Sequence, residues 1–151
     1  MYALVYISEA NQSFSMAELR TLAKRANWRN KLLSITGFLT YKDGQFLQYL
    51  EGEEKTVISL MNTIRQDSRH TVVKLIELPD QPQQYLVNWH MRYLSGPDLR
   101  TVNLEDLLAD TLKKLDSGIY SQEKILQLVH SILSKFSRYF ADNPLVFSPP
   151  L

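Results

Sequence analysis

Residues 33–50 read LSITGFLTYKDGQFLQYL, and this stretch predicts a β-hairpin. Two apolar, strand-like runs, 33–41 and 45–50, lie on either side of the tripeptide Lys42-Asp43-Gly44. Glycine adopts positive φ angles without a steric penalty, so Gly44 suits a tight turn between the two runs. The hairpin supplies two neighbouring strands around which the other elements can be placed.

Strand-like and helix-like segments alternate on both sides of this hairpin. The first helix begins at a capping box, because Ser15 is followed three residues later by Glu18. The other predicted elements follow from hydrophobic spacing. They are strands at 2–7, 72–78 and 87–94, and helices at about 16–28 and 53–66. The order βαββαββ predicts an α+β fold, a ferredoxin-like sandwich with two helices on one face of the sheet.

The sequence changes character after Ser95-Gly96-Pro97. Two amphipathic helices are predicted at about 102–115 and 121–140, and we expect them to pack on the other face of the sheet because each needs an apolar surface to cover. The last nine residues contain three prolines and resemble a tail. The predicted organisation is therefore a domain at 1–96, a helical extension at 97–142 and a tail at 143–151.

Composition excludes several classes of protein. The chain has 151 residues, a formal net charge of +1 and no cysteine. Without cysteine there are no disulfides, thiolate nucleophiles, cysteine-ligated metals or flavin–cysteine adducts. The small net charge gives no broad attraction to nucleic acid or anionic lipid, and no apolar run approaches the length of a membrane span. We expect a cytoplasmic protein with neither nucleic acid nor membrane as a partner.

Three polar residues stand in apolar surroundings. Tyr6 ends the first strand, Asn30 follows the first predicted helix, and Gln48 lies inside the strand FLQYL. A buried glutamine without a hydrogen-bond partner costs roughly 1–3 kcal/mol. Taken alone, Gln48 could therefore face solvent or pair with a backbone group.

Taken together, these positions resemble the BLUF domain, a blue-light sensor that uses FAD. The resemblance covers about residues 2–94 and depends on the order and spacing of short motifs. These are Tyr6 with Ser8 in YIS, Asn30 five residues before Ile35-Thr36-Gly37, residues 46–52 (FLQYLEG), residues 67–70 (DSRH) and residues 89–91 (WHM). The resemblance implies a domain that binds a flavin without covalent attachment and has no catalytic turnover.

The resemblance also implies where the flavin lies. The ring would occupy an apolar slot between the two helices, and FAD is expected with FMN as an alternative. Leu22, Ala26, Leu60 and Ile64 would line the slot, and Asn30 would orient the ring through its amide. The implied cofactor-binding residues are Tyr6, Ser8, Asn30, Gln48, Ile64, Asp67, Arg69 and His70.

For Arg69 and His70, a simpler structural role is as plausible as a role in binding the cofactor. Arg69 suits the geometry of a phosphate, but it could equally be a solvated charge after the second helix. His70 could contact the ring or the phosphate side of the cofactor. It could equally be a cation at the helix C-terminus, where the helix dipole favours positive charge.

The implied photochemistry is a light-driven transfer of an electron and a proton from Tyr6, with Gln48 as the proton path. Gln48 would end rotated or tautomerised, and its new hydrogen bond to the flavin would shift the absorption to the red. Trp89 and Met91 would form a switch, because both cannot occupy the space beside Gln48, although ordinary core packing is an alternative for each. The signal would pass to an unidentified protein effector, and a homo-oligomer is expected.

Other classes of function make different demands on the sequence. A flavin oxidoreductase on the same scaffold would need a nucleotide motif, and neither GxGxxG nor GxxxxGK[ST] occurs. An RNA-binding sheet would need exposed aromatics flanked by basic residues, whereas Tyr49, Trp89 and Tyr93 lie near leucines. A flavin-storage role stays open.

Overall fold

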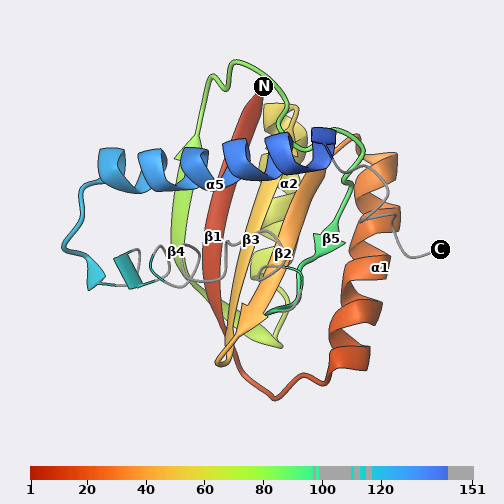
Figure 1. Ribbon diagram of the computed structural model, residues 1–151. Coiled ribbons are helices and arrows are strands. Elements are labelled where there is room, and N and C mark those ends of the chain that lie inside the picture. The colour runs from red at the N-terminus through yellow and green to blue at the C-terminus, as the bar shows by residue number, and fades with distance from the viewer. Residues whose placement is uncertain (97, 99–109, 111–112, 115–116, 143–151) are drawn as a thin grey trace. The chain divides into compact units, whose positions relative to one another are not determined.

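The computed structural model describes residues 1–96, 98, 110, 113–114 and 117–142. The chain divides into two compact units, Met1–Ser95 and Gly96–Leu151, which are described separately. The first unit contains five strands and two helices (Figure 1). In chain order they are β1 (Tyr2–Ala10), α1 (Met16–Leu32), β2 (Thr36–Lys42), β3 (Gln45–Gly52), α2 (Glu54–Arg65), β4 (His70–Leu78) and β5 (Arg92–Tyr93).

The five strands form one mixed sheet in the order β4-β1-β3-β2-β5. The pairs β4–β1, β1–β3 and β3–β2 are antiparallel, and β5 is parallel to β2. Because β1 and β2 are both antiparallel to β3, they run in the same direction, with α1 as their connection and β3 between them. This is the split arrangement of a ferredoxin-like sandwich, so the predicted α+β fold class is confirmed.

Both helices of this unit contribute to one core on one face of the sheet. Alternate residues of β1 and β3 point to the same face, and those at even positions join apolar residues of α1 and α2 in a single cluster. Figure 1 shows α2 behind the central strands in this view. The buried members of this helix-side cluster include Leu4, Tyr6, Leu19, Ala26, Phe46, Leu50, Leu60, Met61 and Met91.

The hairpin and the capping box form as the sequence predicts. The turn uses positive φ at both Asp43 (52°) and Gly44 (78°), which matches the right-handed twist of the flanking strands. Ser15 Oγ accepts from the amide of Glu18 at 3.1 Å, and the Glu18 carboxylate accepts from the amide of Ser15 at 2.6 Å. The helix extends beyond the predicted end near residue 28, because no breaking residue interrupts it before the turn at Ser34.

The predicted continuous strand over 87–94 is wrong. Only Arg92–Tyr93 pair with the sheet, and Asn88 has a φ of 69°, which interrupts an extended run. The residues before β5 instead form an irregular segment along the edge of β2, where the Gly37 amide donates to the Trp89 carbonyl at 2.6 Å. The alternation of side chains between two faces therefore does not apply to residues 87–91.

In the second unit, helix α5 (Gln122–Asp142) confirms the second predicted C-terminal helix. Most of the predicted helix 102–115 and all of the tail 143–151 lie outside the described residues. Packing of the C-terminal helices on the sheet stays a prediction. Within the described part of the chain, no helix combines the length and apolar character needed to cross a membrane.

Candidate functional site

A cavity of about 700 Å³ lies among α1, α2 and the helix-side face of the sheet. This volume is in the range of pockets that hold a cofactor or a drug-sized ligand. Leu22 and Ala26 of α1 and Ile64 of α2 line it, as the sequence predicts, whereas Leu60 does not and belongs to the core.

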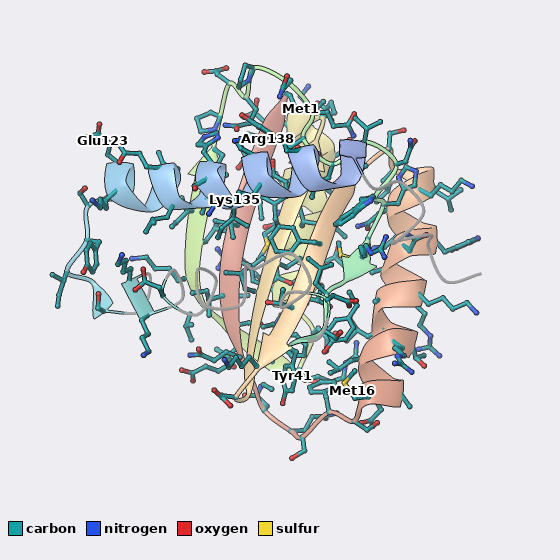
Figure 2. All side chains as sticks on the ribbon, viewed as in Figure 1. Met1, Met16, Tyr41, Glu123, Lys135 and Arg138 are labelled. Carbon is teal, nitrogen blue, oxygen red and sulfur yellow. The ribbon has the colours of Figure 1, made fainter. Side chains whose placement is uncertain are left out.

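Aromatic side chains form part of the wall of this cavity. Phe14 and Phe46 both line it, with their ring centroids 5.1 Å apart in an edge-to-face arrangement. Tyr41 packs against both rings. Tyr41 at the end of β2 and Met16 at the start of α1 lie at the same end of the unit (Figure 2). The cavity is therefore bounded here by packed rings.

Tyr6 and Gln48 meet at the wall of the cavity. They are register partners on β1 and β3, so their side chains lie next to each other on the same face. The Tyr6 hydroxyl donates to Gln48 Oε1, and both residues are buried and line the cavity. Burial raises the pKa of Tyr6 well above its ordinary value, so the hydroxyl stays protonated and available as a donor.

Met91 contacts the Gln48 amide on the side opposite to Tyr6. Gln48 Nε2 donates to Met91 Sδ at 3.4 Å, and Met91 is buried in the helix-side cluster. Trp89 is only half-buried, and the Arg92 guanidinium lies 4.9 Å from the centre of its ring. Of the two residues assigned to the switch, the structure places Met91 against Gln48, and neither lines the cavity.

Asn30 is completely buried but does not line the cavity. Its Nδ2 donates to the His90 carbonyl at 2.7 Å, and its Oδ1 accepts from Arg29 Nε at 3.2 Å. Its neighbour Arg29 does line the cavity, and desolvation by burial lowers the pKa of Arg29. Arg29 was not among the residues predicted from the sequence, although its spacing from Leu22 and Ala26 places it on the cavity face of α1.

The DSRH motif lies at the rim of the cavity. Asp67, Arg69 and His70 all line it. Arg69 Nη2 and Nε donate to the Asp67 carboxylate at 2.6 and 3.0 Å, and this hydrogen bonding lowers the pKa of Asp67 to about 2. His70 Nε2 lies 2.9 Å from the Ile64 carbonyl near the end of α2. His70 thus contacts the C-terminal end of α2, as the simpler interpretation predicts. It also borders the cavity, as the assignment to the cofactor site requires.

Ser8 is buried at a register shift between β1 and β4, and it does not line the cavity. Its hydroxyl is one of two buried side-chain polar groups without a hydrogen-bond partner among the described residues. The structure thus brings Tyr6, Gln48, Ile64, Asp67, Arg69 and His70 together around one cavity and leaves Ser8, Asn30, Trp89 and Met91 outside its lining.

The residues around the cavity fit a flavin. Apolar side chains of two helices face each other, as a flat ring system requires, and the Tyr6–Gln48 pair lies at the sheet side. Arg25, Arg29 and Arg69 border the same space, and arginine suits phosphate oxygens.

Comparison with known proteins agrees with this arrangement. The family described as BLUF, sensors of blue-light using FAD, matches residues 1–92. The chain belongs to this family of flavin-dependent blue-light sensors. Subunit beta of the photoactivated adenylate cyclase of Euglena longa is 37% identical over 116 residues, which make up 76% of this chain and 14% of that protein. The matched part of the chain therefore spans a small fraction of that curated relative.

Solved structures share the fold. The dark-state structure of BlrB, a BLUF protein, has a TM-score of 0.66 at 22% identity, covering 91% of this chain and 96% of that one. Klebsiella pneumoniae BlrP1 with FMN and cyclic diGMP has a TM-score of 0.57 at 27% identity, covering 99% of this chain and 36% of that one. The comparison with BlrB supports the architecture alone. The comparison with BlrP1 shows the same architecture as part of a larger protein.

Proposed function

We propose that the cavity of this BLUF domain holds a non-covalent flavin and that Tyr6 and Gln48 carry its light reaction. The observation that supports this most directly is the hydrogen bond from the Tyr6 hydroxyl to Gln48 Oε1 at the cavity wall. A tyrosine is an accessible electron donor, and here its proton already points at an acceptor. Loss of the electron and loss of the proton can therefore occur together.

A bound flavin supplies absorption of blue light and, when excited, the capacity to accept an electron. Tyr6 gives up one electron and passes its phenolic proton to Gln48 Oε1. The return of both restores Tyr6, and Gln48 is left with its amide rotated or tautomerised. In this arrangement Gln48 would donate a hydrogen bond to the bound flavin, which would shift the absorption to the red.

Several side chains would hold the cofactor. Leu22, Ala26 and Ile64 would sandwich the ring, and Arg69 and His70 would border its rim or phosphate side. Asn30 would turn its amide from the His90 carbonyl toward the ring, or act through Arg29. We propose FAD as the cofactor, in line with the family, and FMN as the alternative, since the BlrP1 structure contains FMN.

The output would be a change in protein contacts, without turnover by this chain. The relative from Euglena longa is a subunit of a photoactivated adenylate cyclase, in which the part similar to this chain is a small fraction. By analogy, we propose a protein effector or a second copy of the chain as the receiver of the signal. We also propose a cytoplasmic location.

Reconstitution with a flavin tests the proposed function. The purified chain is mixed separately with FAD and with FMN, passed over a desalting column, and its visible spectrum is recorded in the dark and during blue light. We expect about one retained flavin per chain and a reversible red shift. A colourless protein after both treatments would contradict flavin binding. A bound flavin whose spectrum does not respond to light would instead support a storage or oxidoreductase role.

A further inference from the structure

Glu51 is a completely buried carboxylate that accepts four hydrogen bonds. Its Oε1 accepts from Thr36 Oγ1 at 2.9 Å and from the Leu86 amide at 2.6 Å. Its Oε2 accepts from the Tyr49 hydroxyl at 2.8 Å and from the Tyr85 amide at 3.0 Å. A buried charge needs such saturation, and two of these donors belong to the backbone of the segment that leads to Met91.

Glu51 and Gln48 point to opposite faces of the sheet. They are three residues apart in β3, whose pairing with β1 and β2 is regular, so their side chains project in opposite directions. Gln48 lies on the helix side with Tyr6 and contacts Met91 there. Glu51 lies on the other face, where it is the register partner of Thr36.

The segment Tyr85–Met91 therefore passes around the edge of β2 from one face to the other. It starts at the Glu51 carboxylate. At the edge, the Trp89 carbonyl accepts from the Gly37 amide at 2.6 Å, and His90 Nδ1 lies 3.0 Å from the Ile35 carbonyl. On the helix side, the Met91 carbonyl accepts from Asn27 at 3.1 Å, beside the Gln48–Met91 contact.

We propose that Glu51 is a positioning residue of the light switch: by fixing the Tyr85 and Leu86 amides on the far face, it sets where Met91 lies against Gln48. The proposal rests on the proposed function of Tyr6 and Gln48. Two residues of β3 contact the two ends of the segment: Glu51 binds the Tyr85 and Leu86 amides, and Gln48 contacts Met91. A shift of Met91 on the helix side is therefore opposed by the hydrogen bonds to Glu51 on the far face. These hydrogen bonds consequently influence how long the lit state persists.

Methionine-methyl NMR in the dark tests the positioning directly. The chain has four methionines, and Met61 is buried in the same helix-side cluster as Met91 without contacting the segment through any described hydrogen bond. Glu51→Gln replaces one acceptor oxygen by an NH₂ group that faces donors, so the amides are no longer held together. We expect the Met91 methyl signal to move or split and the Met61 signal to stay in place.

The flavin-loaded chain supplies the second measurement. In Glu51→Gln, the dark absorption maximum and the red shift should be retained, and the decay of the lit state should change by about fivefold or more. Glu54→Gln, which removes an exposed carboxylate at the start of α2, is the matched control and should leave both the decay and the Met91 signal unchanged.

An unchanged Met91 signal in Glu51→Gln would overturn the proposal, and so would equal movement of Met61 and Met91, which would indicate general loosening of the core. If Glu51→Gln does not fold, Tyr49→Phe removes one of the four donors, and a smaller Met91 shift in that variant is then required. A wild-type protein without a red shift would contradict the proposed function alone, because the dark NMR experiment does not depend on light.

Discussion

Tyr6 and Gln48 face each other across neighbouring strands, and the hydroxyl of the first donates to the amide oxygen of the second. Because the tyrosine hydroxyl can only be a donor to this oxygen, Gln48 must present its NH₂ group in the other direction. There it meets the sulfur of Met91. The orientation of one amide thus links a redox-active side chain to the segment that crosses the edge of the sheet.

Removal of either partner of this hydrogen bond should abolish the red-shifted state. Tyr6→Phe keeps the ring volume and removes the hydroxyl and the accessible electron, while Gln48→Leu removes the proton path. Both variants should retain flavin. Absorption spectra during blue light provide the measurement, and a normal red shift in either variant would contradict the proposed order of Tyr6, Gln48 and flavin.

High pH should leave this chemistry unaffected until the protein unfolds. Burial raises the pKa of Tyr6 above its ordinary value, so the hydroxyl keeps its proton at a pH where an exposed tyrosine ionises, about 10. The red shift of the wild-type protein should therefore have the same amplitude at neutral pH and at about pH 10. Loss of amplitude with an apparent pKa below that, while circular dichroism is unchanged, would contradict this expectation.

Asn30→Ala should weaken flavin retention. The Asn30 side chain accepts a hydrogen bond from Arg29, which lines the cavity, and donates one to the His90 carbonyl in the segment Tyr85–Met91. Loss of this side chain therefore disturbs the site even if the Asn30 amide does not contact the flavin ring. Retention is measured as the ratio of flavin to protein absorbance after dialysis. Asn27→Ala is the control, since Asn27 contacts the same segment at the Met91 carbonyl and does not line the cavity. Equal retention in wild type and Asn30→Ala would remove Asn30 from the site.

Hydrophobic spacing and turn residues were sufficient to predict the order of the elements and the residues that face the helices. Lys42-Asp43-Gly44 marks the hairpin, and the even positions of 45–50 mark the face that carries Gln48. The resemblance to the BLUF family predicted that Tyr6 and Gln48 act together, and the pairing register of β1 and β3 explains why their side chains touch.

The segment before β5 could not be predicted by the same means. Residues 87–94 (VNWHMRYL) alternate between apolar and polar side chains like a strand, but Asn88 adopts a positive φ. Hydrogen-bond partners of this segment lie far away in the sequence. Glu51 similarly resembles a solvated strand end in sequence. Its donors include the backbone amides of Tyr85 and Leu86, and no local pattern predicts a contact between a side chain and amides so distant in the chain.

Gly37→Ala should destabilise the sheet more than Gly44→Ala. A Cβ at Gly37 would lie 1.9 Å from the Tyr49 carbonyl oxygen, and backbone must move to admit it, at a cost of about 3 kcal/mol. A Cβ at Gly44 meets nothing within 4 Å, so only the positive φ of 78° opposes the change, at about 1 kcal/mol. Denaturant unfolding measures both, and equal midpoints for the two variants would contradict the close approach of β2 and β3.

The Asp67–Arg69 pair should stabilise the fold except in strong acid. The pKa of Asp67 is lowered to about 2, so its contribution is fully present above the unfolded value near 3.8 and is lost as the pH falls through about 2. Both side chains are partly exposed, which limits the contribution to roughly 0.5–1 kcal/mol. The melting temperatures of wild type and Asp67→Asn should differ at about pH 6 and converge toward about pH 2. A constant difference across this range would exclude the ion pair as its cause.

Met91 should separate the colour change from the output. Met91→Ala leaves Tyr6 and Gln48 in place, so the red shift should persist, but it removes the side chain that connects Gln48 to the segment Tyr85–Met91. Met91→Leu is the matched variant, since it keeps most of the volume and loses the sulfur acceptor. Hydrogen exchange on residues 102–140, compared in the dark and in the light, measures the output. We expect a light-dependent change in wild type, a reduced change in Met91→Leu and none in Met91→Ala. Equal changes in wild type and Met91→Ala would show that Met91 does not transmit the signal, and no change in wild type would show that the signal leaves through another surface.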